Sequence, residues 1–333
     1  MINAMRRFIT ALCLILFGST SFLAASSPLE RCVRTQHLVN ALPTSHDYYD
    51  KMVAAVGEQR WNMALQYSQV LLEMYPSSPF APEATYYTGY AYMQRGNLAE
   101  ANDWYTKYLA DYGALKHYEE AIKHKFDIAM AFSEGHRKNL FNNYHLPKWS
   151  SANDDAVRIF EEVISAFPRD DLAAQSLYRK AELLVAQLDF DEAIESYKTF
   201  IRRFPKHTRT SESYLGIVQA YALKSKKLFP DPDFIELATI TAEKFQRAFP
   251  SDERVQKAWD EIASLKDWFA KDLLTHANYW ERKKKPEAAD IYYKSILVRY
   301  GGTPTADIAK ERLTAHEIYN QNTTPEAALP RRH

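Results

Sequence analysis

The chain has 333 residues, of which 46% are hydrophobic and 25% charged, and this composition excludes wholesale disorder. Its 42 Lys and Arg residues balance 42 Asp and Glu, which argues against a nucleic-acid binder. Only 9 residues are Gly, while 22 are Tyr, 17 Phe and 6 Trp. Because doubly wound sheets and phosphate-binding loops use glycine at turns and close approaches, this composition favours an all-α protein.

The first 27 residues are typical of an export signal rather than of the fold. Two arginines precede an apolar run, and small residues at its end supply a cleavage zone. A membrane anchor is the alternative, but the uninterrupted apolar core at 11–17 is short against the ~20 residues of a membrane span. We therefore expect residues 1–27 to be removed and residues 28–44 to form an N-terminal linker.

Cys32 is the only cysteine after this signal, so the exported chain cannot form an internal disulfide. A cysteine soon after an export signal resembles the lipid-attachment site of bacterial lipoproteins. Leu29 fits that pattern, whereas Glu30 and Arg31 stand where it has small residues. Lipidation of Cys32 and a free, intermolecular or incidental thiol are both open.

A repeat dominates the remaining sequence. An Ala is followed eleven residues later by an aromatic residue and then by Pro or Gly, and the spacing of apolar residues between them forms one helical stripe. The pattern occurs six times: Ala64–Tyr75–Pro76, Ala101–Tyr112–Gly113, Ala156–Phe167–Pro168, Ala193–Phe204–Pro205, Ala238–Phe249–Pro250 and Ala289–Tyr300–Gly301.

An additional apolar-periodic segment and a short turn precede each of these helices. Small residues at position 20 and, for Gly89 and Ala181, at position 8 let paired helices approach closely. This is the 34-residue helix–turn–helix pattern of tetratricopeptide (TPR) repeats. The sequence therefore predicts an all-α TPR solenoid of about six units over residues 45–318, wound as a right-handed superhelix.

The largest insertion into this pattern, residues 134–153, falls between the two helices of the third unit. It is polar but carries Phe141, Tyr144 and Trp149. These aromatic residues would either pack onto the solenoid or contact a partner, since long ordered loops are often functional. Residues 319–333 are polar and contain two prolines, so we expect a disordered tail.

Three repeats end in an aromatic residue, proline and small polar residues: Tyr75–Pro76–Ser77–Ser78, Phe204–Pro205–Lys206–His207–Thr208 and Phe249–Pro250–Ser251–Asp252. Together with the export signal and Cys32, this variant resembles the BamD (YfiO) family of TPR lipoproteins in the outer-membrane β-barrel assembly machine. The similarity covers about residues 45–313.

The resemblance implies a scaffold that catalyses nothing and needs no cofactor. Its C-terminal repeats would bind a BamA-like barrel subunit, and its N-terminal repeats would receive C-terminal segments of unfolded outer-membrane proteins. In the TPR frame, Tyr49 and Val53 of the first unit and Tyr86, Tyr90 and Met93 of the second face the peptide groove. The alternative for each of them is that it packs against a neighbouring helix. Tyr offers rigid apolar area with a polar tip, and Met adapts to varied partners.

Motifs of other function classes are absent from the sequence. There is no His-Glu-x-x-His motif, no cysteine pair for zinc, no Walker A loop and no Gly-x-Ser-x-Gly element. Residues 282–285 form a basic run in the last inter-helix turn, either solvated or facing an acidic partner or anionic head groups. We expect no enzyme, no metal and no nucleic acid. The resemblance implies that the protein is located at the periplasmic face of the outer membrane, held there by a lipid or through a partner. The alternative is that it is a soluble periplasmic adaptor.

Overall fold

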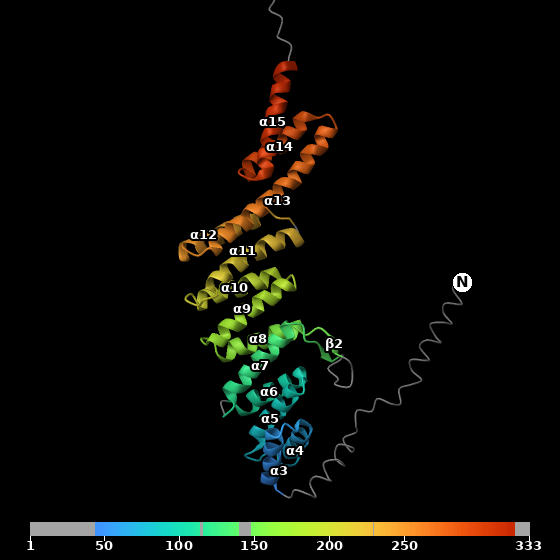
Figure 1. Ribbon diagram of the computed structural model, residues 1–333, viewed down its shortest axis with the longest axis vertical. Coiled ribbons are helices and arrows are strands. Elements are labelled where there is room, and N and C mark those ends of the chain that lie inside the picture. The colour runs from blue at the N-terminus through green and yellow to red at the C-terminus, as the bar shows by residue number, and fades with distance from the viewer. Residues whose placement is uncertain (1–43, 114–115, 140–147, 229, 324–333) are drawn as a thin grey trace, which may run out of the picture. The chain divides into compact units, whose positions relative to one another are not determined.

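The computed structural model describes residues 44–113, 116–139, 148–228 and 230–323 (Figure 1). The predicted export signal, the linker with Cys32, and Phe141 and Tyr144 of the insertion lie outside these ranges. The elements are α3 (Ser45–Gly57), α4 (Trp61–Met74), α5 (Ala81–Gln94), α6 (Leu98–Tyr112), α7 (Tyr118–Ser133), β1 (Lys138–Asn139), β2 (Lys148–Ser150), α8 (Asn153–Ala166), α9 (Asp171–Ala186), α10 (Phe190–Arg203), α11 (Thr210–Lys227), α12 (Asp233–Ala248), α13 (Arg254–Arg282), α14 (Pro286–Tyr300) and α15 (Pro304–Thr323).

Helices α3 to α14 follow one another as six successive helix pairs, of which α7 and α8 are separated by the insertion rather than by a short turn. This arrangement confirms the all-α TPR fold predicted from the spacing. The six anchor alanines lie on the second helices α4, α6, α8, α10, α12 and α14, and each is at most 1% exposed. Close approach explains the small residues: a Cβ on Gly89 of α5 would lie 3.1 Å from the ring of Tyr105 on α6. The small residues of the repeat pattern are therefore the positions at which neighbouring helices come into contact.

Most of the first helices end with the same backbone conformation. After five of the six first helices, the second residue beyond the helix end has positive φ: Gln59, Gly96, Gly135, Leu188 and Lys284. The N–H of the next residue returns to a carbonyl five positions back, as from Arg60 to Ala55 O at 2.8 Å. This bond satisfies a carbonyl that the ending helix leaves open, and the positive φ reverses the chain.

The second helices end by a different route. Tyr75, Phe204 and Phe249 each donate their backbone N–H to the carbonyl four residues back, and Pro follows each of them. Proline has no N–H and disfavours helical backbone at the residue before it, and the three aromatic residues have ψ between 54° and 66°. The helix therefore stops at the aromatic residue. The aromatic–Pro pairs of the sequence are thus helix terminators.

The described chain divides into two compact bodies, with the division inside α7 after Ile122. The N-terminal body holds α3 to α6, the first residues of α7 and most of the β1–β2 ribbon. Its core is rich in aromatic residues, and Tyr48, Tyr105 and Tyr108 are each at most 1% exposed. Tyr48 packs with Met52 and Leu71, whereas Tyr105 and Tyr108 pack between α5 and α6.

The C-terminal body runs from Lys123 to the end of α15, apart from the insertion. One continuous cluster of buried residues extends along it from Ala181 to Ala309. α13 is 29 residues long and contacts α11, α12, α14 and α15, which explains the wide spacing of the last two anchor alanines. α15 continues to Thr323, past Ile318, where the sequence predicted the folded part to end.

The insertion between α7 and α8 contains the paired strands β1 and β2, a local exception to the all-α prediction. Trp149 lies in β2, and the other two aromatic residues predicted for partner contact are outside the described residues. Among the residues that the structure describes, no helix combines the length and apolar character needed to cross a membrane.

Candidate functional site

The first helices of the first two repeats, α3 and α5, carry the residues predicted to face a peptide. We call their shared surface, formed by His46, Tyr49, Val53, Phe80 and Glu83, the α3–α5 face. Tyr49 stacks on Phe80 with ring centroids 4.5 Å apart, and His46 stacks on the same ring at 5.4 Å. The Tyr49 and Phe80 rings are half-buried and the His46 ring is exposed, and together they form a short aromatic surface with polar atoms at its edge.

Glu83 is the polar centre of this face. Its Oε2 accepts a hydrogen bond of 2.5 Å from the Tyr49 hydroxyl, and its Oε1 accepts one of 3.3 Å from the Lys116 ammonium. Burial alone would raise the pKa of the Glu83 carboxyl, but these two bonds outweigh it and hold the pKa below its ordinary value. Burial and the bond to Glu83 raise the pKa of the Tyr49 hydroxyl, which stays a donor.

Tyr86 corrects the sequence prediction, because it is a core residue and only 5% exposed. Its ring stacks on the buried His117 ring at 4.1 Å, nearly parallel, and also packs against Tyr105 and Tyr108. The backbone N–H of His117 donates to the Tyr108 hydroxyl at 3.1 Å. The segment before α7 therefore covers the ring that a peptide would need to reach.

The other three predicted residues keep part of their surface. Val53 is 37% exposed, the most open of the five predicted groove residues. Tyr90 is half-buried with its ring edge-on to Trp61 at 5.8 Å. Met93 accepts a weak hydrogen bond from the Tyr105 hydroxyl to its sulfur at 3.9 Å. Tyr49 and Glu83 are thus in direct contact. Tyr90 instead contacts α4, and Met93 contacts α6.

Sequence reasoning missed Phe80, Lys116 and His117. Phe80 immediately precedes α5, a position that the count of groove residues within the helix did not reach. Lys116 and His117 precede α7, the first helix of the repeat whose anchor is Ala156. The insertion separates α7 from that anchor, so the repeat spacing does not fix where α7 begins. The end of α6 at Gly113 is the sequence signal that lies nearest to both residues.

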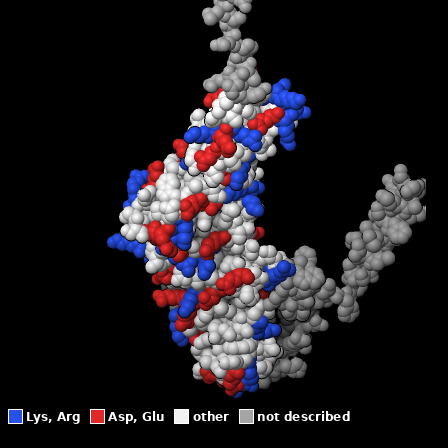
Figure 2. All heavy atoms as spheres, turned by 45° about the horizontal axis from the view of Figure 1, so that its top comes forward, with Lys and Arg blue, Asp and Glu red and all other residues white. Residues whose placement is uncertain are grey.

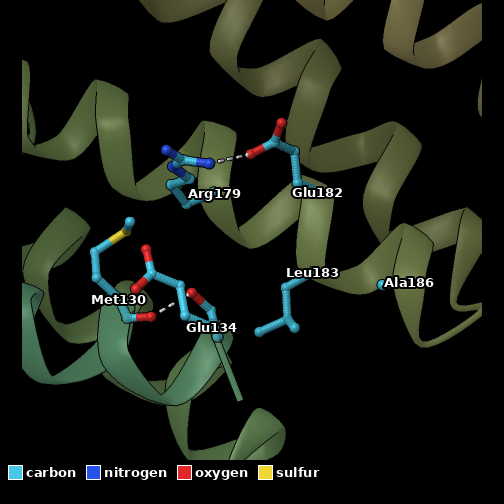
Figure 3. A pocket seen from close by; sticks show the side chains of 7 residues that line it. Met130, Glu134, Arg179, Glu182, Leu183 and Ala186 are labelled. Atoms are coloured by element: carbon cyan, nitrogen blue, oxygen red, sulfur yellow. Dashed lines mark hydrogen bonds and ion pairs between the residues drawn. The ribbon is translucent and has the colours of Figure 1, made fainter. Parts of the chain in front are cut away.

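A hollow of about 180 Å³ lies in the C-terminal body beside α7 and α9 (Figure 3). Met130 and Leu183 line it together with Glu134 and the Arg179–Glu182 ion pair, whose N–O distance is 3.0 Å. Ligand pockets for small molecules usually measure about 300–1,000 Å³. This hollow could accept one side chain of a partner but is small for a cofactor.

Protein-family models match a segment in each of the two bodies. A model described as tetratricopeptide repeat matches residues 49–115, which include the α3–α5 face. The YfiO model, described as outer membrane lipoprotein, matches residues 133–333, about three fifths of the chain. The chain belongs to the YfiO family. It is thus a TPR protein of a family of outer membrane lipoproteins that act as protein-interaction scaffolds.

Solved TPR structures resemble this YfiO-family chain at low identity. A TPR protein from Parabacteroides merdae is 13% identical, covering 81% of this chain and 97% of its own, with a TM-score of 0.34. The C-terminal part of a TPR protein from Cytophaga hutchinsonii is 14% identical, covering 84% and 93%, with a TM-score of 0.37. YrrB, described as a TPR protein with an unusual peptide-binding site, is 14% identical over 68% and 97%, with a TM-score of 0.35. No curated protein matches the sequence.

The YfiO match begins at the end of α7 and so includes the insertion and the last three complete repeats. Within the described ranges, no group of three or more His, Cys, Asp or Glu side chains is placed to hold a metal ion. What the described surface offers is aromatic and charged contact area on helices, which suits binding of protein segments.

Proposed function

We propose that this chain is a non-catalytic scaffold in the insertion of β-barrel proteins into the outer membrane, as the family resemblance implies. Its C-terminal repeats would bind a BamA-like barrel subunit, and its α3–α5 face would receive the C-terminal segments of unfolded outer-membrane proteins. The observation that carries this proposal is the YfiO match over residues 133–333. That match contains the repeats to which the resemblance assigns the barrel subunit.

The α3–α5 face supports the peptide half of the proposal. An extended segment that ends in an aromatic residue needs apolar surface for the ring and polar groups for its backbone. Phe80 and Val53 offer apolar surface, while Glu83 and Lys116 offer an acceptor and a donor of opposite charge. Tyr86 contributes indirectly, because its stack on His117 fixes the segment that presents Lys116.

The chain would be held at the periplasmic face of the outer membrane, by a lipid on Cys32 or through its barrel partner. The family description supports this location. Cys32 lies outside the described residues, and Glu30 and Arg31 before it depart from the usual lipid-attachment sequence. Attachment through the partner would need no lipid.

The test is to purify the tagged chain from detergent-solubilised envelopes and to identify its partners by mass spectrometry, together with its intact mass. We expect a near-stoichiometric outer-membrane barrel protein with periplasmic repeat domains. The intact mass then distinguishes a lipidated Cys32 from a cut near Ser26. A soluble chain without any barrel protein would overturn the proposal and favour a periplasmic adaptor.

A further inference from the structure

The turn between α13 and α14 concentrates positive charge. Arg282, Lys283, Lys284 and Lys285 are consecutive and exposed, and no ion pair involves any of them among the residues that the structure describes. The carboxylate of Glu281, which precedes them, pairs instead with His316, at an N–O distance of 3.2 Å, and with Arg312. The group forms part of the blue surface at the upper right in Figure 2.

The backbone fixes how this charge is displayed. Lys284 has φ of 57°, its N–H donates to Glu281 O at 2.8 Å, and the N–H of Lys285 donates to Trp280 O at 3.1 Å. The turn is therefore a closed, ordered one. It presents the four cations at the outer end of the α13–α14 pair rather than in a groove.

Two aromatic rings lie beneath the lysines. Lys283 Nζ is 5.6 Å from the ring centroid of Tyr279, and Lys285 Nζ is 5.6 Å from that of Trp280. Tyr279 is 46% exposed. Tyr and Trp beside Lys are typical of membrane–water interfaces, where the ring lies at head-group level and the ammonium reaches the phosphates.

The outer face of α14, the helix that follows this turn, adds apolar surface along its length. Val298 is 84% exposed and Ile291 is 68% exposed, the highest values for large hydrophobic side chains in the described ranges. They are seven residues apart with the exposed Lys294 between them, so they share one helix face. Tyr293 and Ile296 point the other way, into the core.

We propose that the α13–α14 turn and the outer face of α14 dock onto an anionic phospholipid surface. The lysines bind head-group phosphates, and Tyr279, Ile291 and Val298 enter the head-group layer. Three of the four cations are Lys, which is depleted at protein–protein interfaces whereas Arg is enriched there, so a membrane is favoured over an acidic protein. This contact is independent of peptide binding by the α3–α5 face and would add to any lipid on Cys32.

The experiment uses the exported chain with Cys32→Ser, so that no acyl chain contributes. Sedimentation measures its binding to vesicles of phosphatidylcholine with one third phosphatidylglycerol, and to vesicles of phosphatidylcholine alone. We expect binding to the anionic vesicles only, and loss of binding at high salt. The triple variant K283Q/K284Q/K285Q should bind about 100-fold more weakly, given the gain per lysine near an anionic surface.

The matched control is R202Q/R203Q/K206Q, which removes the same charge from exposed residues at the end of α10. This control should bind like the parent chain. A blue shift of tryptophan emission on binding should disappear in Trp280→Phe, and thermal melting shows that each variant is folded. Equal loss in both triple variants, or equal binding to both vesicles, would overturn the proposal. So would binding to soluble polyglutamate but not to vesicles, which would instead support an acidic protein partner.

Discussion

Tyr49 on α3 donates a hydrogen bond to Glu83 on α5, with 2.5 Å between the two oxygens. This bond links the first helices of two successive repeats on the face that we propose as the peptide-binding surface. Because the Glu83 side chain is 25% exposed and also bonded to Lys116, this face is held in place without a bound peptide.

Tyr49→Phe should lower the free energy of unfolding by about 1–2 kcal/mol, since a hydrogen bond to a charged acceptor is lost. In a chain that already carries Glu83→Gln, the same change should cost less, because the charged acceptor is gone. Urea unfolding of the two single variants and the double variant measures this coupling. Strictly additive effects would show that the bond contributes nothing.

Gly216 on α11 tests the close approach of neighbouring repeats. A Cβ at this position would lie 2.8 Å from Cζ of Tyr197, whose ring is only 4% exposed and packs against Tyr178. Gly216→Ala should therefore destabilise the chain by about 1–3 kcal/mol through overpacking. Thermal or urea unfolding provides the measurement.

Gly57 is the matched control for that substitution. It ends α3, and a Cβ there would meet nothing within 4 Å. Gly57→Ala should stabilise the chain by about 0.5–1 kcal/mol, because alanine loses less backbone freedom on folding. If both variants were destabilised alike, helix spacing would not explain the glycine at position 216.

The turn between α12 and α13 gives a prediction about pH. The Arg254 guanidinium bonds both carboxylate oxygens of Asp252 at 2.9 Å and lowers the pKa of that carboxyl from 3.8 to about 2. A lowered folded pKa stabilises the fold above pH 3.8, and this contribution is lost as the pH falls through about 2. The Asp252 side chain is 15% exposed, so screening by water is limited.

Asp252→Asn should therefore lower the free energy of unfolding by about 2 kcal/mol at neutral pH. The difference from the wild type should shrink towards zero as the pH falls through 2. Urea unfolding of both chains over this range makes the comparison. A difference that stayed constant with pH would show that the ion pair is not its cause.

The sequence was sufficient to predict the second helix of every repeat. Alanines such as Ala193, at a fixed distance from an aromatic–Pro pair, mark both the packing line and the end of a helix. The ribbon β1–β2 and the full length of α13 could not be counted from this spacing. Both lie where extra residues separate one anchor alanine from the next.

The candidate site was predicted less well than the fold. The TPR frame states which residues of α3 and α5 turn to one side, but not which later segment lies over them. Tyr86 follows the frame and is still buried, because His117 stacks on its ring. Phe80 and Lys116 belong to segments before helices, where no helical period applies.

We expect an extended segment that ends in an aromatic residue to bind the α3–α5 face. The most direct test places a photo-crosslinking residue at Val53 on this face, and at Met74, which is 49% exposed at the end of α4. With a labelled peptide from the C-terminus of an outer-membrane barrel protein, we expect strong crosslinking from Val53 and little from Met74. Addition of Tyr49→Ala should weaken the Val53 crosslink. Equal crosslinking at both positions, or none at Val53, would contradict the account.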